Sequence, residues 1–511
     1  MPQAVPRTVT DIVVWHRADL RTVDNAALAT AVEDADRVAP VFVVNPAYYG
    51  EAGLACDARL RFLHESLCDL RRQYRDLGSD LTLLSGDPRR RLAERLADGW
   101  TVYCNRDVTS RRGRERDRAL LDRDGVTVFE DDGIRWPDER DPDGTVAVDT
   151  RVRWDESCAD YFERDQHPRP DSVGPNPIDS EVTVEEIARR HDVAPEKSGV
   201  PEGGTVAGSE RLSAFLDRLG EYPGVVSPPA AAQARSSRLS QYLKFGCLSE
   251  RQVYQRVQAA PSSRGRSMYT SRLYWNRHYH QKLADWPGWT ERAVNPVFRG
   301  LYRDQHDADL DRAWREGRTG FPMVDAAMRA LTETGYINFR MRALVATFYV
   351  YVLKQWWKPG ADFMYYHLVD ADPAINYTQW QSQCNLTGVH PVRVYDPAKQ
   401  AREYDPEGEF VREYVPELAG LPDEHLARPE ATPVGVQDAC GVDIGTAYPY
   451  PVVEYDHEAR VARDDFATLD ERAKEALSDP QVRRRCSFSN RGRETDEGDG
   501  DDSGQASLSE F

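Results

Sequence analysis

The chain has 511 residues, of which 40% are hydrophobic, and its formal net charge at pH 7 is −19. This hydrophobic share is sufficient for a sizeable core, which excludes disorder along the whole chain. An acidic field of this size repels nucleic acid, so a nucleic-acid partner requires a local basic patch.

Residues 1–135 alternate short β-rich runs with amphipathic stretches such as Asp57–Leu77. This alternation predicts an α/β domain in which helices cover a parallel sheet. The first strand is not followed by GxGxxG, so the dinucleotide-binding fingerprint is absent. The predicted strands are Asp11–Trp15, Val38–Val44, Leu81–Leu84, Thr101–Cys104 and Val126–Phe129.

The rest of the chain divides into three parts by composition. Residues 136–205 are rich in Pro, Asp and Gly, which predicts a connector that runs over the surface. Residues 206–485 carry apolar side chains at helical spacing, which predicts an all-helical domain. Residues 486–511 contain the acidic run ETDEGDGDD and few apolar residues, which predicts a disordered tail.

Composition and local patterns also bear on compartment and metal binding. The longest apolar run, Ala343–Leu353, is too short to span a membrane, and the first residues do not resemble a signal peptide. The eight cysteines form no CxxC pair, so we expect reduced thiols in a cytoplasm and no metal site. Packing of a helix face explains His278 and His280 better than metal binding does. The acid-rich, Lys-poor balance favours adaptation to high salt over an ordinary acidic cytosolic protein.

Two stretches indicate ligand binding only weakly when each is taken alone. The Arg/Asp-rich loop within Val13–Leu28 follows the first strand, where α/β sheets bind ligands, although on its own it is better explained as a charged turn with a helix start at Asp24. The run from Ser236 to Ser240 combines hydroxyls with Arg238, as a phosphate cradle would, although a helix cap would use the same residues.

A third cluster is more informative. Arg340 and Arg342 lie in a run that becomes strongly apolar, so at least one guanidinium is expected to be buried beside a carboxylate, with Asp370 and Asp372 as the candidates. A structural ion pair accounts for these charges but not for the polar and aromatic residues that follow in Asp370–Trp380.

Over roughly residues 10–480, these motifs together resemble the DNA photolyase/cryptochrome flavoprotein family. The resemblance implies an N-terminal Rossmann-like α/β antenna domain and a C-terminal helical domain that binds FAD. Several motifs in the same order carry it: VVWHRADLRTVDNAAL, SSRLSQYLKFGCLS, YWNRHYHQ, AWREGRTGFPMVDAAMRAL, GYINFRMRALVATF, LVDADPAINYTQWQ and YDPAKQAREYDPEGEFVREYVPEL.

The resemblance also implies residue roles. Asn376 would face flavin N5, and Trp380 and Trp357 would be the first two electron donors of a chain that reduces excited FAD. Arg342 would pair with Asp370 beside the flavin ring, and Tyr222 with the Ser236–Ser240 run would hold the phosphates. The cofactor-binding residues would be Tyr222, Ser236, Ser237, Arg238, Leu239, Ser240, Arg342, Asp370, Ala371, Asp372 and Asn376.

Other positions depart from the family pattern. Trp275 matches the aromatic platform for a flipped base, but Arg272 stands where a carboxylate is usual. Phe339 replaces the usual Asn or catalytic His, and Ala343 replaces Met or a second His. Asp304 aligns with the third Trp of the electron-transfer chain. Tyr302 or Trp356 would therefore have to replace that Trp as electron donor, or the electrons would have to take another route. The predicted DNA contacts are Arg272, Trp275, Phe339, Arg340 and Arg393.

The leading hypothesis is a photolyase in which light-excited reduced FAD donates an electron to a pyrimidine dimer in UV-damaged DNA. The alternative is a cryptochrome-type photoreceptor without repair activity, favoured by the altered pocket and the acidic tail. A flavoprotein oxidoreductase without a light role fits least well, because the dinucleotide fingerprint is absent. The resemblance allows an antenna chromophore, either deazaflavin or folate, and we expect a monomer.

Overall fold

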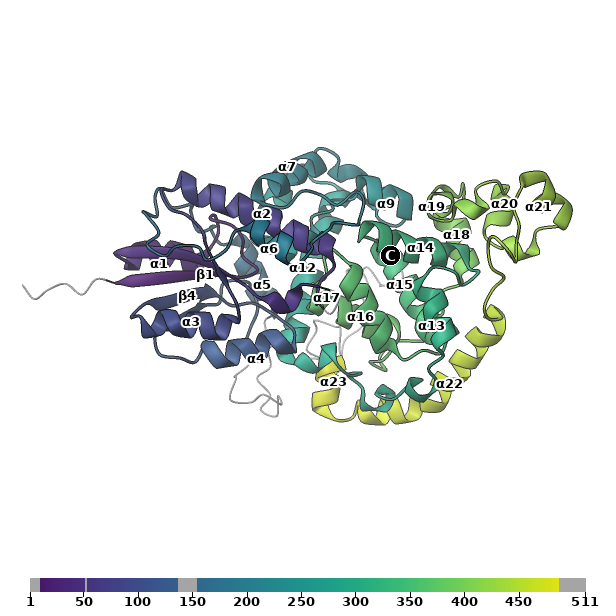
Figure 1. Ribbon diagram of the computed structural model, residues 1–511. Coiled ribbons are helices and arrows are strands. Elements are labelled where there is room, and N and C mark those ends of the chain that lie inside the picture. Colours follow the sequence, from purple (N-terminus) through teal and green to yellow (C-terminus); the bar gives the residue numbers. More distant parts are fainter. Residues whose placement is uncertain (1–9, 51–52, 137–153, 487–511) are drawn as a thin grey trace, which may run out of the picture.

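The computed structural model describes residues 10–50, 53–136 and 154–486, so the predicted acidic tail lies outside the described residues except for Cys486. An α/β domain lies at one end of the molecule and a larger helical domain at the other (Figure 1). The predicted α/β-plus-helical fold class is therefore confirmed.

The α/β domain is built on a five-stranded parallel sheet in the order β3-β2-β1-β4-β5. The central strand β1 is buried on both faces, with Ile12 and Val14 in one apolar cluster and Val13 and Trp15 in another. The strands are β1 (Asp11–His16), β2 (Arg37–Val44), β3 (Thr82–Ser85), β4 (Thr101–Asn105) and β5 (Val126–Phe129). The helices of this domain are α1 (Ala26–Asp34), α2 (Asp57–Asp76), α3 (Pro88–Ala97) and α4 (Arg111–Leu120).

The strand order reverses between β1 and β4, and this position determines where a ligand can bind. In open parallel sheets, a crevice forms at the carboxyl ends of the two strands where the order reverses. The loop that follows β1, which the sequence marks as Arg/Asp-rich, lies at this crevice and contributes Ala18 and Asp19 to a cavity wall.

In the described part of the region predicted to be a connector lie helices α5 (Trp154–Glu163) and α6 (Val184–Arg190). Between them the chain follows the edge strand β3. The Asn176 amide donates to the carbonyls of Pro40 and Asp80, and the Glu181 N–H donates to the Leu83 carbonyl. These bonds cover the exposed edge of the sheet, which would otherwise offer unpaired backbone groups to another chain.

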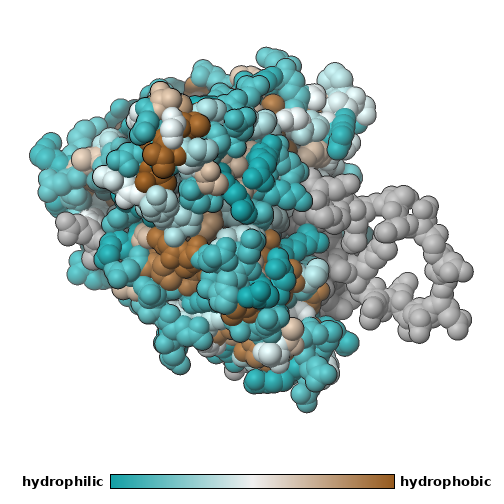
Figure 2. All heavy atoms as spheres, turned by 90° about the vertical axis from the view of Figure 1, so that its right-hand side faces the viewer, coloured by the Kyte–Doolittle hydropathy of each residue, from teal (hydrophilic) through white to brown (hydrophobic). Residues whose placement is uncertain are grey.

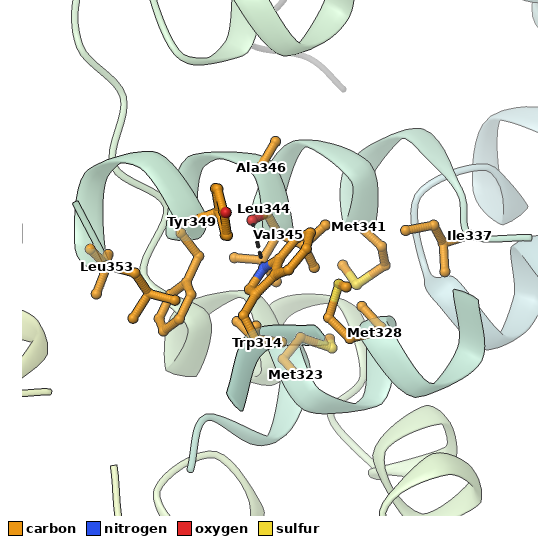
Figure 3. Packing of buried hydrophobic residues seen from close by; sticks show 14 of the residues in the cluster. Trp314, Met323, Met328, Ile337, Met341, Leu344, Val345, Ala346, Tyr349 and Leu353 are labelled. Carbon is orange, nitrogen blue, oxygen red and sulfur yellow. Dashed lines mark hydrogen bonds between the residues drawn. The ribbon is translucent and has the colours of Figure 1, made fainter. Parts of the chain in front are cut away.

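The helical domain packs around a core rich in methionine and aromatic residues. Within this core, the Trp314 indole donates to the Val345 carbonyl at 3.1 Å, beside Met323, Met328 and Met341 (Figure 3). The first helices are α7 (Thr205–Leu216), α8 (Tyr222–Val225), α9 (Pro229–Arg235), α10 (Ser240–Lys244), α11 (Glu250–Gln258), α12 (Arg264–Asp285), α13 (Ala308–Arg315) and α14 (Pro322–Thr334). They are followed by α15 (Phe339–Thr347), the π-helical turn η6 (Phe348–Val352), α16 (Trp357–His367), α17 (Pro373–Gln383), α18 (Pro397–Tyr404), α19 (Glu409–Tyr414), α20 (Asp423–Leu426), α21 (Val434–Cys440), α22 (Tyr455–Ala476) and α23 (Pro480–Cys486).

The surface on the side of α20, α21 and α22 is largely hydrophilic, with separate apolar patches (Figure 2). Among the helices that the structure describes, none combines the length and the apolar character that a membrane span requires.

Candidate functional site

The cavity that gathers most of the predicted site residues, which we call the main cavity, has a volume of about 350 Å³ and is lined by residues of both domains. The α/β domain contributes the ends of β1, β4 and β5, and the helical domain contributes α10, α12, α15 and α17. The structure brings most of the predicted site residues to this cavity: Tyr222, Ser236, Ser237, Arg238, Ser240, Arg272, Trp275, Phe339, Arg340, Arg342, Asp370, Asp372 and Asn376.

The remaining predicted residues lie elsewhere. Leu239 is buried among apolar side chains, and Ala371 lines a second cavity. Trp380 borders a small void behind Asn376, and Trp357 lies in the apolar core. Arg393 is exposed and is not among the residues that line the described cavities.

The loop from Ser236 to Ser240 connects α9 to α10 and places polar groups at the cavity. Arg238 adopts a left-handed backbone conformation, with φ of 49°, and its guanidinium lies 4.0 Å from the centre of the Tyr336 ring. Ser236 Oγ lies 3.1 Å from the Tyr336 hydroxyl, and the Tyr269 hydroxyl donates to Ser237 Oγ at 3.2 Å. Hydroxyls beside an arginine provide the donors that a diphosphate requires.

Arg342 and Asp370 form a hydrogen-bonded ion pair in the cavity wall. Arg342 Nη2 lies 3.0 Å from both carboxylate oxygens, and Nε donates to the Ile337 carbonyl at 2.9 Å. The two side chains are 15% and 7% exposed, so water screens the pair only weakly. This pair holds α15 against the chain that leads into α17.

Asp372 caps the start of α17 and carries a full negative charge. Its carboxylate accepts hydrogen bonds from the N–H groups of Ala374 and Ile375 and lies 3.2 Å from His280 and 3.5 Å from Lys244. Burial alone would raise the pKa of Asp372, but His280 and Lys244 hold it well below its usual range. The His280 ring thus contacts a carboxylate, and the described residues contain no group of side chains that could hold a metal ion.

Asn376 presents an unused acceptor. Its Nδ2 donates to the Ala361 carbonyl at 3.0 Å, and because a carbonyl only accepts, this bond determines the orientation of the amide. The Oδ1 atom is buried and has no hydrogen-bond partner among the described residues. An unpaired buried acceptor in a cavity wall calls for a ligand N–H, which reduced flavin carries at N5.

At the predicted DNA-facing residues, aromatic rings and guanidinium groups lie together. The Trp275 ring is 5.0 Å from that of His278 and 5.7 Å from that of Tyr279. Burial raises the pKa of Tyr222, and the charge of Arg272 and its side-chain hydrogen bond partly oppose this shift. Arg340 lies over the Tyr404 ring at 3.7 Å.

A second cavity of about 990 Å³ lies between the two domains, and the sequence indicated it only through the Arg/Asp-rich loop. It is lined by the carboxyl ends of β1 and β2, including Arg17 and Asn45, and by α16. Residues that are distant in sequence form its walls, so no local motif could have predicted its size.

Comparison with known proteins agrees with this arrangement. The family model described as DNA photolyase matches residues 12–137, and the model described as the FAD binding domain of DNA photolyase matches residues 269–468. A cryptochrome DASH from Natronomonas pharaonis is 32% identical, over 87% of this chain and 98% of that protein. A deoxyribodipyrimidine photo-lyase from Synechococcus sp. is 29% identical, over 92% of this chain and 98% of that protein. The crystal structure of an archaeal photolyase from Sulfolobus tokodaii with two FAD molecules has a TM-score of 0.74 at 26% identity, covering 90% of this chain and 100% of that chain.

The fold and the main cavity define a two-domain flavoprotein whose helical domain binds FAD. The chain belongs to the DNA photolyase/cryptochrome family.

Proposed function

We propose that this protein is a blue-light-driven, FAD-dependent photolyase that repairs pyrimidine dimers in UV-damaged DNA. One observation carries the proposal: the residues suited to FAD and those suited to an extruded base line the same cavity. Arg342, Asp370 and Asn376 belong to the first set, and Trp275 and Arg272 belong to the second. An enzyme that acts on a base inside duplex DNA must receive that base in such a cavity.

The proposed roles follow from the chemistry of each side chain. When bound, light-excited reduced FAD would supply the electron that splits the dimer. Asn376 Oδ1 accepts the N–H of the cofactor, and the Arg342–Asp370 pair holds the adjacent wall in place. Trp275 provides a stacking face for a flipped base, and Arg272 donates to a carbonyl or phosphate oxygen. Phe339 contributes an apolar contact that excludes water.

A cryptochrome-type photoreceptor without repair activity is the second candidate. Arg272, Phe339 and Ala343 depart from the pattern of well-known repair pockets, and these departures favour it. The relatives are divided in the same way, because one is named a cryptochrome DASH and another a deoxyribodipyrimidine photo-lyase.

We also propose that the second cavity holds an antenna chromophore, either deazaflavin or folate. Support comes from its position at the carboxyl ends of β1 and β2 and its volume of about 990 Å³. The crystal structure of the Sulfolobus tokodaii photolyase contains two FAD molecules, so a second flavin is the third chromophore to test. The absorbance spectrum of the purified holoprotein distinguishes these chromophores.

We further propose that the protein is a cytoplasmic monomer. The eight free cysteines support a reducing compartment, and size-exclusion chromatography tests the oligomeric state.

A repair assay tests the proposed function. FAD-loaded protein is mixed with single- and double-stranded DNA that carries cyclobutane dimers or (6-4) photoproducts, and lesions are counted after blue light or darkness. We expect light-dependent loss of at least one lesion. Trp275→Ala should weaken binding of damaged DNA by ~1–3 kcal/mol, the usual value of one stacked base, whereas Trp275→Phe retains a stacking face. Loss of neither lesion in the light would exclude repair and favour the photoreceptor.

A further inference from the structure

At the third position of the tryptophan chain that the family resemblance implies, this protein has Asp304 and therefore no indole. Asp304 is exposed in the short turn Arg303–Gln305. The two indoles present also lack a strong proton acceptor. Trp357 Nε1 has no hydrogen-bond partner in the described part of the chain, and Trp380 Nε1 donates to Met364 Sδ at 3.4 Å. A thioether is a weak acceptor, so an oxidised indole here remains a buried cation, which is energetically costly.

Helices α16 and α17 pack so that a tyrosine of α17 lies beside the Trp357 indole and on the same helix face as Trp380. Gly360 faces Trp380 closely enough that a Cβ atom on Gly360 would lie 2.7 Å from Trp380 Cη2. One helical turn away, the rings of Trp357 and Tyr377 have centroids 6.3 Å apart at an interplanar angle of 81°. Tyr377 and Trp380 are three residues apart on α17, so they share one face of that helix.

Tyr377 has the strong proton acceptor that the two indoles lack. Its hydroxyl donates to Asp362 Oδ1 at 2.7 Å, and Asp362 is also paired with Lys358. Tyr377 is 7% exposed and Asp362 is 47% exposed, so the ring is buried while the carboxylate reaches solvent. Burial, together with the Asp362 charge, raises the pKa of Tyr377 well above its usual range, so the phenol is protonated at neutral pH.

We propose that Tyr377 is the terminal electron donor of light-driven flavin reduction, with Asp362 as the acceptor of its proton. The inference rests on the FAD binding of the proposed function and on the electron chain that the family resemblance implies. One electron passes from Tyr377 to the oxidised Trp357, the phenolic O–H bond breaks, and the proton binds an Asp362 oxygen. The products are a neutral indole, a neutral tyrosyl radical and a protonated carboxyl group. A soluble thiolate then supplies one electron and becomes a thiyl radical, and the proton on Asp362 returns to the phenolate oxygen.

Several other buried tyrosines also donate to an aspartate, and Tyr349 and Tyr302 serve as matched comparisons. The Tyr349 hydroxyl donates to Asp311 at 2.6 Å, and the Tyr302 hydroxyl donates to Asp465 at 2.8 Å. Tyr349 lies 6.0 Å from Trp380 and is therefore the stronger competitor. Its carboxylate partner is only 14% exposed, so a proton that arrives there exchanges with solvent less readily than one on Asp362.

The experiment uses FAD-loaded protein with oxidised flavin, a thiol reductant and no DNA. Blue-light pulses are followed by transient absorption and electron paramagnetic resonance. In the wild type we expect a tyrosyl radical and stable flavin reduction. Tyr377→Phe should remove the radical and lower the yield of reduced flavin several-fold. Asp362→Asn should slow formation of the radical and change its solvent deuterium isotope effect, which a purely structural role would not alter.

Variants of the two comparison tyrosines show whether the radical belongs to Tyr377. Tyr349→Phe and Tyr302→Phe should retain both the radical and the yield. A radical that persists in Tyr377→Phe, or that is lost in Tyr349→Phe instead, would overturn the inference. A wild-type protein that does not reduce flavin in the light would also overturn it. These readouts need no DNA, so a protein that forms the radical but repairs no lesion contradicts only the proposed repair function.

Discussion

The fold shifts the pKa values of two carboxylates along the main cavity, Asp132 and Asp372, in opposite directions. Burial raises the pKa of Asp132 to about 6, although the Arg277 charge opposes the shift. At Asp372, the charges of His280 and Lys244 overcome the effect of burial and lower the pKa. The same residue type therefore responds to pH differently depending on which cation lies beside it.

The raised pKa of Asp132 predicts a pH-dependent stability. Because its folded pKa of about 6 exceeds the ordinary value of 3.8, the folded protein binds this proton more tightly than the unfolded chain does. Its contribution to stability is therefore greatest below about pH 4 and declines as the pH rises to about 6. Asp132→Asn should raise the free energy of unfolding at pH 7.5 by ~1–2 kcal/mol, with little change near pH 4.

Urea unfolding of both proteins at the two pH values measures this difference. The asparagine amide of the variant keeps an oxygen that can accept the Ile134 N–H bond, so the substitution removes the charge and leaves that contact. Asp304→Asn, at an exposed position, is the control and should change stability by less than ~0.5 kcal/mol at either pH. Equal effects of Asp132→Asn at both pH values would contradict the prediction.

At the scale of elements, a buried ion cluster joins the two domains. Arg251, near the start of α11, is hydrogen-bonded to Asp24 in the loop after β1 and lies 2.7 Å from Asp131 after β5. Ser249 also donates to Asp24 and caps α11 through a reciprocal pair of hydrogen bonds with Gln252. Both aspartates line the main cavity, so this cluster determines how the α/β loops meet the helical wall.

Removing Arg251 should therefore be costly. The side chains of Arg251 and Asp24 are 2% and 1% exposed, and Arg251→Ala would leave buried Asp24 and half-buried Asp131 without this guanidinium. We expect a loss of ~3–5 kcal/mol in the free energy of unfolding, measured by denaturant titration. Arg312→Ala removes an arginine from an exposed pair with Asp309 and should cost less than ~1 kcal/mol. Similar losses in the two variants would show that the cluster does not hold the domains together.

At the scale of the whole molecule, the net charge of −19 that the sequence gives also characterises the molecular surface. Charged residues make up 30% of the chain, and the face shown in Figure 2 is mostly hydrophilic. Repulsion among exposed carboxylates destabilises a compact state, and salt screens it over a few ångströms at molar concentration.

The midpoint of thermal unfolding should therefore rise as KCl increases from ~0.1 to ~2 M, because screening weakens this repulsion. Differential scanning fluorimetry or circular dichroism measures the midpoint. Sucrose at matched osmolality separates charge screening from general exclusion of solute and should produce a smaller increase. A midpoint that stays constant or falls with KCl would refute adaptation to high salt.

The α/β half of the fold was predictable from local pattern. Buried parallel strands are short apolar runs, and all five predicted strands match observed strands to within about one residue at each end. The helices within residues 136–205 were missed because their stability comes from contacts that are distant in sequence. Phe162, for example, packs on Tyr254 with ring centroids 4.5 Å apart.

For the site, the sequence alone determined the kinds of residue and their order, which was sufficient to indicate the family and its FAD domain. Tertiary structure alone decided which of them share a cavity, which is why Arg393 and Leu239 lie outside it. It also placed Tyr377 between an indole and a carboxylate. The physical reason is that motifs reflect neighbours along the chain, whereas cavities, ion clusters and ring contacts arise where distant segments pack together.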